Sequence, residues 1–102
     1  MIFVLATVNA VEGRRSEFLD AFRELVPLVH AEDGCIEYGA SVDVQTNLPV
    51  QVGPREQTVV IIEKWRDLAA LEGHLMAPHM LAYRERIKGL VANVSLQILE
   101  PA

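Results

Sequence analysis

Two uninterrupted apolar runs constrain the fold of this chain more than any other feature. Residues 2–9 are nearly all apolar, and four β-branched residues stand consecutively at 59–62 within the run 57–66. Successive side chains of a strand point to opposite faces, so such a run predicts a strand that is covered on both faces. We therefore expect 2–9 and 57–66 to form the two central strands of one sheet.

A helix is expected after the first of these runs. Apolar residues recur at steps of three and four over 14–32, which predicts a helix with one apolar face. Pro27 lies inside this pattern and is expected to kink the helix or to restart its last turns. Gly34 can adopt a positive φ and is expected to end the helical segment.

A more polar strand and a long connection separate this helix from the second apolar run. Residues 35–43 predict the strand, and Gly39 within it predicts a bulge or the close approach of another backbone. The connection over 44–56 is longer than a tight hairpin needs. The alternation of Val50 and Val52 predicts either a short extra strand or an arm.

A second helical region and a last strand complete the chain. Asp67 is expected to cap a helix over 68–75, and Pro78 is expected to break it and to begin a second helix that runs to Lys88. Apolar and polar residues then alternate from 93 to 98, which predicts a half-buried final strand.

This order of elements predicts one domain over 1–102 of the α+β class, with the ferredoxin-like βαββαβ plan and an antiparallel sheet. The two more polar strands should then be its edges. Two helices cover only one face of such a sheet, whereas both central runs are apolar on both faces. We therefore expect a second copy of the chain to cover the far face, in a homodimer.

Charge and cysteine content disfavour several classes of protein. The formal net charge is −5, which argues against a general binder of nucleic acid or of an anionic membrane surface. No apolar run approaches the roughly 20 residues of a membrane span. Cys35 is the only cysteine, so no intrachain disulfide is possible and a cytoplasmic location is expected. The common motifs for nucleotides, flavins, zinc proteases and serine hydrolases do not occur.

Ile61, Glu63 and Trp65 share one face of the third strand, and this face is expected to look toward the helices. A carboxylate among β-branched residues must be paired, be protonated or face a wet cavity. The candidate cation partners for it are Arg66, Arg84 and Arg86. Trp65 either packs in the core or holds a ligand.

His74 and His79 are five residues apart with Pro78 between them, so they do not share a helix face as a pair of metal ligands would. We therefore expect no metal site. A helix N-terminus disfavours a charged imidazole at His79, and a neutral imidazole beside a pocket can act as a general base. In the alternative interpretation, one histidine caps or packs and the other is exposed.

Four other side chains are candidates for the wall of the same pocket. Tyr38 and Tyr83 could present phenol groups, Met80 could line the wall, and Asn9 could donate its side-chain amide. Core packing is the alternative for the first three, and a turn is the alternative for Asn9.

Taken together, three groups of residues resemble the antibiotic biosynthesis monooxygenase family. They are Gly34-Cys35 with Tyr38, Glu63-x-Trp65, and His74-Leu75-x-x-Pro78-His79-Met80-x-x-Tyr83. The resemblance covers almost the whole chain, including the connection over 44–56, and it is greatest to the bacterial quinol monooxygenases of the family.

The resemblance implies a dimeric α+β barrel of two ferredoxin-like subunits. It also implies oxidation of a quinol or polyphenol by dioxygen as co-substrate, with no metal, flavin or other cofactor. His74, His79 or Glu63 would then be the catalytic residue that moves a phenolic proton. The substrate-binding residues would be Trp65, Tyr38, Tyr83, Ile61, Met80 and Asn9.

Two departures narrow what this resemblance implies. Antibiotic-tailoring members carry an asparagine where this chain has Ile61, so their site cannot be transferred. Haem-degrading relatives carry a tryptophan where this chain has His74, which disfavours haem degradation.

Two alternative functions stay open. An isomerase of phosphorylated sugar diones shares Glu63, His74 and Pro78-His79 with this chain, and this alternative predicts an anion site that uses Arg84 or Arg86. A non-catalytic dimeric binding or stress protein would instead have Glu63 and both histidines salt-bridged or exposed, with no cavity beside Trp65.

Overall fold

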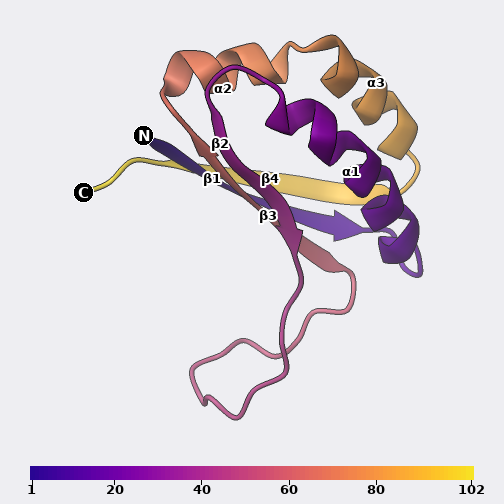
Figure 1. Cartoon of the computed structure of the whole chain (residues 1–102). Coiled ribbons are helices and arrows are strands. Elements are labelled where there is room, and N and C mark those ends of the chain that lie inside the picture. Colours follow the sequence, from indigo (N-terminus) through magenta and orange to yellow (C-terminus); the bar gives the residue numbers. More distant parts are fainter.

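The computed structural model describes all residues from 1 to 102, and its elements follow the predicted order with the second helical region in two parts. These elements are β1 (Ile2–Ala10), α1 (Arg15–His30), β2 (Cys35–Ser41), β3 (Thr58–Trp65), α2 (Leu68–Leu75), α3 (Pro78–Ile87) and β4 (Val91–Leu99). The three helices lie together on one face of the sheet (Figure 1). The fold is therefore α+β and ferredoxin-like, as predicted. No helix is long and apolar enough to span a membrane.

The sheet has the strand order β2-β3-β1-β4, and all three pairings are antiparallel. The two apolar runs are thus the central strands and the two more polar strands are the edges, as predicted. Val4 lies opposite Glu63 on one side and opposite Ile98 on the other. This register places the even-numbered residues of β1 on the face that the helices cover, where Val4, Ala6 and Val8 are buried.

α1 is one continuous helix through Pro27, so the expected restart of its last turns does not occur. The proline removes one backbone donor, and the hydrogen bonds of the helix continue on its C-terminal side. The Ala31 N–H still binds the Pro27 carbonyl. The predicted apolar face is buried against the sheet and consists of Phe18, Ala21, Phe22, Leu25 and Val29.

The turn after α1 packs closely against the start of α2 because Gly34 has no side chain. Its φ is +83°, and a Cβ at this position would lie 2.5 Å from the Ala70 Cβ. The Gly34 carbonyl also accepts a hydrogen bond of 2.8 Å from the Arg66 N–H at the end of β3. The predicted stop at Gly34 is therefore confirmed, and the turn is fixed beside α2.

The bulge in β2 is not at Gly39, where the sequence pattern placed it. The register shifts between Cys35 and Glu37, whereas Gly39 pairs regularly with Ile62 and has nothing within 4 Å of the Cβ it lacks. Ile36 is the residue left over, and its side chain is about half exposed. The irregularity thus arises where the strand leaves the tight Gly34 turn.

Both boundaries of the second helical region agree with the prediction. The Asp67 carboxylate accepts a hydrogen bond of 2.8 Å from the Ala70 N–H, which caps α2. Pro78 is the first residue of α3, where its missing N–H costs nothing. The break between the two helices leaves His74 in the last turn of α2 and His79 in the first turn of α3.

Strand β4 is less buried than expected. Val94, Leu96 and Ile98 pair with Val8, Ala6 and Val4 and so lie on the helix side of the sheet, but each is about half exposed. Val94 and Leu96 line the cavity described below, together with residues of α3.

Residues 44–56 form an arm that projects away from the body of the molecule (Figure 1). No strand occurs within it. At its base the Arg55 guanidinium binds the Asp43 carboxylate through two hydrogen bonds of 2.8 and 2.9 Å. Further along, the Gln51 side chain donates to the Val44 carbonyl at 2.7 Å. The large apolar side chains of the arm are exposed, and they are Val44, Leu48, Val50 and Val52.

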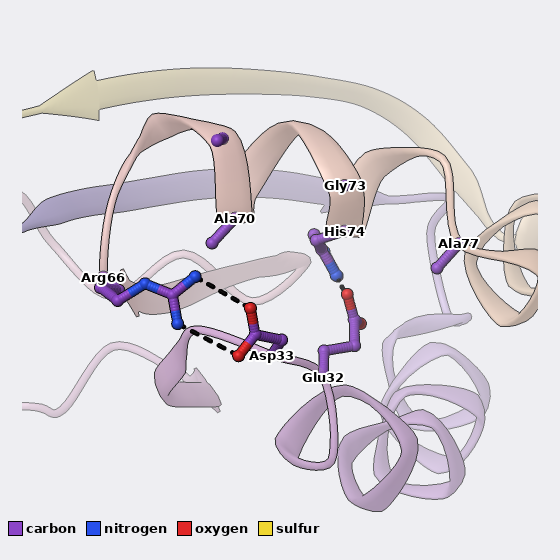
Figure 2. Close-up of a pocket in the computed structure, with 8 residues that line it drawn as sticks. Glu32, Asp33, Arg66, Ala70, Gly73, His74 and Ala77 are labelled. Atoms are coloured by element: carbon purple, nitrogen blue, oxygen red, sulfur yellow. Dashed lines mark hydrogen bonds and ion pairs between the residues drawn. The ribbon is translucent and has the colours of Figure 1, made fainter.

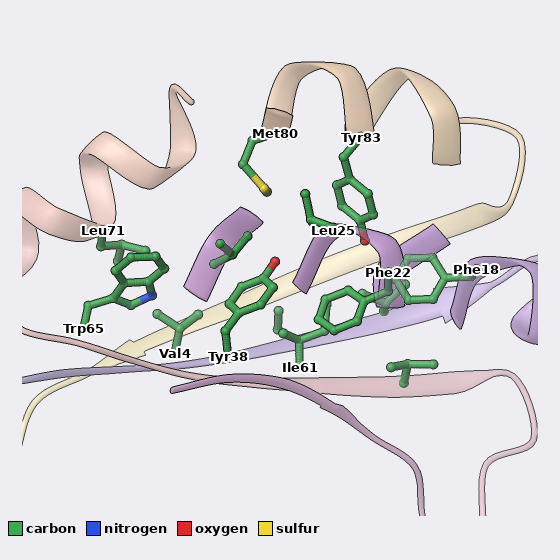
Figure 3. Close-up of a cluster of buried hydrophobic side chains, with 14 residues drawn as sticks. Val4, Phe18, Phe22, Leu25, Tyr38, Ile61, Trp65, Leu71, Met80 and Tyr83 are labelled. Atoms are coloured by element: carbon green, nitrogen blue, oxygen red, sulfur yellow. The ribbon is translucent and has the colours of Figure 1, made fainter. Parts of the chain in front are cut away.

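The core fills the space between the sheet and the helices (Figure 3). Trp65, Phe18, Phe22, Val29 and Val59 are its largest fully buried side chains. The aromatic rings form a continuous contact series, with Phe22 stacked on Tyr38 at a centroid distance of 5.2 Å. This packing supports one wall of the cavity described next.

Candidate active site between the sheet and the helices

A largely apolar cavity of about 210 Å³ lies between the helix-facing side of the sheet and the pair α2 and α3. Three of its polar lining residues come from separate elements: Tyr38 from β2, Glu63 from β3 and His74 from α2. Such a cavity, with a few convergent polar groups, is the usual form of a small-molecule site. The full lining is Ala6, Val8, Tyr38, Ile61, Glu63, His74, Leu75, Met80, Tyr83, Arg84, Ile87, Val94 and Leu96.

The register of the sheet brings the polar residues of its side of the cavity together. Ile61 and Glu63 are two residues apart on β3 and therefore point to the same face. Tyr38 on β2 lies directly opposite Glu63. On the helix side, Met80 and Tyr83 are three residues apart and project from one face of α3 toward the sheet (Figure 3).

Glu63 has no cation partner, so the predicted pairing with an arginine does not occur. Its side chain is buried, and the hydrogen bond to its carboxylate comes from the Trp65 indole N–H at 2.9 Å. Burial raises the pKa of Glu63 from 4.5 to about 7, although the Trp65 hydrogen bond opposes this rise. Glu63 can therefore hold or release a proton near neutral pH.

The predicted arginine partners of Glu63 bind elsewhere. The Arg66 guanidinium forms two hydrogen bonds with the Asp33 carboxylate, at 2.9 and 3.1 Å. Arg86 pairs with Glu24 on the outer face of the helices. Arg84 lines the cavity, and its guanidinium donates a hydrogen bond of 2.7 Å to the Leu75 carbonyl.

Both tyrosines bring a neutral phenol to the cavity. The Tyr38 hydroxyl points from the sheet toward the helices, and the Tyr83 hydroxyl points from α3 toward the sheet (Figure 3). Burial raises the pKa of each phenol, and the negative charge of Glu63 adds to this effect. The two hydroxyls are therefore protonated and can donate hydrogen bonds.

His74 has its two ring nitrogens in different environments. Nδ1 lies 2.8 Å from Oε2 of Glu32. Nε2 has no hydrogen-bond partner within the chain, and it is not fully buried, because no fully buried side-chain nitrogen or oxygen lacks a partner. The ring is held between Trp65 and Tyr38, at centroid distances of 4.6 and 5.4 Å. Burial lowers the pKa of His74, while the hydrogen bond to Glu32 opposes this change. A neutral imidazole with a free nitrogen is a competent proton acceptor.

A second, more polar pocket of about 410 Å³ lies on the outer side of α2 and is also lined by His74 (Figure 2). Glu32, Asp33 and Arg66 form its polar wall. The figure shows His74 and Glu32 directed toward each other across the space between α2 and the turn after α1. His79 reaches the same Glu32 oxygen from α3, with Nε2 at 2.7 Å.

The cavity brings together six of the nine predicted site residues: Tyr38, Ile61, Glu63, His74, Met80 and Tyr83. The other three lie outside its lining. Trp65 is fully buried behind Glu63 and His74, and His79 lies on the outer side of the helices with Glu32. Asn9 is at the far end of β1, where its amide donates to Asn93 at 2.8 Å and its carbonyl accepts from Thr58 at 2.7 Å.

Glu32 is the residue that the sequence did not identify. It stands in an acidic pair just before Gly34, which reads as an ordinary solvated helix end, and it is 42 residues from His74. Only the folded arrangement of α1, α2 and α3 brings it against both histidines. No group of three or more histidine, cysteine, aspartate or glutamate side chains is arranged to hold a metal ion.

The non-catalytic alternative predicts features that the site has only in part. Both histidines do bind a carboxylate. Trp65 lines no cavity, which this alternative also predicts. However, Glu63 is neither salt-bridged nor exposed, and it lines a cavity.

Comparison with known proteins gives a consistent picture. The family model described as "Antibiotic biosynthesis monooxygenase" matches residues 1–86. The Escherichia coli (strain K12) protein named "Probable quinol monooxygenase YgiN" is 38% identical over 103 residues, which are 99% of this chain and 98% of that protein. The crystal structure of PA3566 from Pseudomonas aeruginosa is 29% identical, with a TM-score of 0.81 over 99% of this chain and 93% of that one. The structure of Rv0793 from Mycobacterium tuberculosis, at 24% identity, has the same fold with a TM-score of 0.81 over 99% of this chain and 94% of that one.

Proposed function

Because this chain belongs to the antibiotic biosynthesis monooxygenase family, we propose that it oxidises a quinol or a related polyphenol with dioxygen. The observation that carries the proposal is the free Nε2 of a neutral His74 beside a largely apolar cavity. A flat aromatic ring suits the apolar walls, and its hydroxyl groups suit Glu63, Tyr38 and Tyr83. The name of the Escherichia coli relative supports the same class of substrate.

The reaction begins with the removal of a phenolic proton by His74 Nε2. The resulting phenolate is electron-rich enough to transfer electrons to dioxygen, and an oxygen atom is then attached to a ring carbon. Cleavage of the O–O bond leaves a hydroxyquinone and one water molecule. The quinol loses four electrons and dioxygen gains four, so no further reductant is consumed. His74 returns its proton to the oxygen that leaves as water.

This scheme requires no cofactor, since the ring of the substrate supplies all the electrons. The protein contributes a base, neutral hydroxyl donors for the negative charge that develops on oxygen, and walls that exclude water. Tyr38 and Tyr83 are the donors in this proposal. Glu63 is the second group that can carry a proton, because its pKa lies near 7.

We propose that the enzyme is a homodimer that buries the far face of the sheet. Ile62 and Leu99 are more than a third exposed on that face, and Phe3 and Leu5 beside them are half-buried. An apolar sheet face without a covering layer is the usual site of association between copies. Two such sheets face to face would form the dimeric barrel.

Incubation of the purified protein with a reduced naphthoquinone and isotopically heavy dioxygen tests the proposed reaction. We expect one heavy oxygen atom in the hydroxylated product and the other in water, at a rate well above that in buffer. Chelator and dialysis should leave the rate unchanged. A rate equal to the buffer rate across a panel of quinols would contradict the proposal.

Arg84 supports a second candidate function, the isomerisation of a small phosphorylated diketo sugar. This arginine lines the cavity and carries a positive charge that could bind a phosphate group. Calorimetric titration of the protein with inorganic phosphate distinguishes the isomerase from the quinol monooxygenase. Binding that Arg84→Gln abolishes would favour the isomerase, whereas the absence of phosphate binding would exclude this role for Arg84.

A further inference from the structure

One oxygen atom of Glu32 accepts hydrogen bonds from two histidines. His74 Nδ1 lies 2.8 Å from Oε2, and His79 Nε2 lies 2.7 Å from the same atom. Because an ionised carboxylate can only accept, each ring must present an N–H to it. The arrangement thus places the proton of neutral His74 on Nδ1 and leaves the lone pair on Nε2.

The exposure of the three side chains increases from the cavity outward. His74 is 2% exposed, Glu32 is 13% and His79 is 24%. His74 belongs to the walls of both the inner cavity and the outer pocket, whereas Glu32 belongs only to the outer one. Glu32 therefore stands behind His74 and has no contact with the cavity that the substrate would occupy.

We propose that Glu32 is a positioning residue for His74, with His79 holding Glu32 in place. The inference rests on the proposed function, since it assigns the group that prepares the base of that reaction. Glu32 fixes the Nδ1–H tautomer of His74 and orients Nε2 to the cavity. It also stabilises the imidazolium formed when Nε2 takes the substrate proton, and the same proton leaves from Nε2 when water forms.

Other charged and titratable groups around His74 cannot take this role. Glu63 and Tyr38 approach from the sheet and Arg84 from α3, but none of them hydrogen-bonds the imidazole ring. Asp33 is next to Glu32 in the chain and in the outer pocket, yet it binds Arg66 instead. Asp33→Asn is therefore the matched control for Glu32→Gln.

Steady-state kinetics of Glu32→Gln test the proposal. We expect kcat for quinol oxidation to fall by about tenfold or more while KM changes by less than about threefold, because Glu32 does not touch the substrate. In the wild type, Glu32 raises the pKa of His74 against the effect of burial. Glu32→Gln lacks this effect, so the acidic limb of its pH profile should lie at lower pH than that of the wild type. Glu32→Asp should restore part of kcat, and Asp33→Asn should behave as the wild type.

His79→Ala is a second variant at a more exposed position. It should lower kcat less than Glu32→Gln does, because Glu32 still binds His74. If Glu32→Gln fails to fold, as judged by circular dichroism, then His79→Ala and the NMR measurement described next carry the test. A wild-type kcat and pH profile in a folded Glu32→Gln, or in His79→Ala where Glu32→Gln does not fold, would overturn the inference and leave the proposed function standing.

Nitrogen NMR of histidine-labelled protein tests the same inference without any substrate. We expect the His74 signal of the wild type to report the Nδ1–H tautomer, and we expect this signal to change in Glu32→Gln but not in Asp33→Asn. An Nε2–H tautomer in the wild type would overturn the inference, even if the protein oxidised no quinol.

Discussion

Trp65 donates its indole N–H to the carboxylate of Glu63, two residues earlier on the same strand, across 2.9 Å. Both side chains are buried, and Trp65 is the only tryptophan of the chain. The hydrogen bond is one of the few interactions that offset the cost of placing this carboxyl group in an apolar environment. It also gives the ionisation of Glu63 an optical reporter.

The fluorescence of Trp65 should therefore titrate with Glu63. We expect a transition with a midpoint near pH 7, because burial raises the pKa of Glu63 to about 7. The measurement is the emission spectrum between about pH 3 and pH 9. The transition should be absent in Glu63→Gln, which keeps an acceptor for the indole N–H. A wild-type midpoint near the ordinary value of 4.5 would show that the carboxyl group is hydrated.

The free energy of unfolding should depend on pH through the same group. The folded protein binds the Glu63 proton more tightly than the unfolded chain does, so this stabilisation is present below pH 4.5 and is lost as the pH rises to about 7. At about 1.4 kcal/mol for each pH unit, the loss amounts to about 3 kcal/mol at most. Urea denaturation at several pH values measures it.

His74 acts in the opposite direction within part of this range. Its pKa is lowered in the folded state, chiefly by burial, so its contribution is present above the unfolded value of 6.5 and is lost as the pH falls below that value. In Glu63→Gln the contribution of Glu63 is removed, so the free energy of unfolding should rise with pH because of His74. A Glu63→Gln variant with the same pH dependence as the wild type would contradict both assignments.

Gly34→Ala should destabilise the protein more than Gly13→Ala does. Both glycines have a positive φ, of +83° and +79°, so each substitution costs about 1–2 kcal/mol from the backbone conformation. Only at position 34 would the new Cβ meet Ala70, at 2.5 Å, whereas nothing lies within 4 Å at position 13. We expect a further loss of about 1–3 kcal/mol at position 34. Equal losses in thermal denaturation would indicate that the turn beside α2 adapts freely.

Ile62→Lys should convert the proposed dimer into a monomer. Ile62 is exposed on the far face of the sheet, so a charge there would be hydrated in the single chain and buried in the dimer. Leu81→Lys is the matched control, since Leu81 is exposed on α3, on the opposite side of the molecule. Sedimentation over a dilution series makes the comparison. A wild-type chain that is monomeric at micromolar concentration would exclude the dimer.

The fold could be predicted from the sequence largely because local signals and burial agree. The apolar runs identified the central strands, and Asp67, Pro78 and Gly34 identified element boundaries through capping and backbone geometry. The failures have local causes. Gly39 pairs regularly and the bulge arises at Ile36, where the strand leaves the Gly34 turn. Pro27 does not restart the last turns of α1, because the backbone hydrogen bonds continue beyond it, from the Ala31 N–H to the Pro27 carbonyl.

Six of the candidate site residues could be predicted from the sequence, and for four of them the period of one element places them on a shared face. Glu63 and Ile61 follow from the period of β3, and Met80 and Tyr83 follow from that of α3. The partner of His74 could not be found in this way, because Glu32 approaches from the end of another helix. Tertiary packing likewise decides whether a buried carboxylate has a cation partner. Glu63 accepts a hydrogen bond from Trp65, whereas Arg66 binds Asp33.

The rate of dioxygen consumption by His74→Ala, with a reduced naphthoquinone as substrate, shows whether His74 is the base of the reaction. His74 is the proposed base, and loss of a general base costs about a hundredfold or more in rate. We expect rapid consumption by the wild type and a loss of this size in His74→Ala, with the fold retained as judged by circular dichroism. Consumption at the wild-type rate by a folded His74→Ala protein would contradict it.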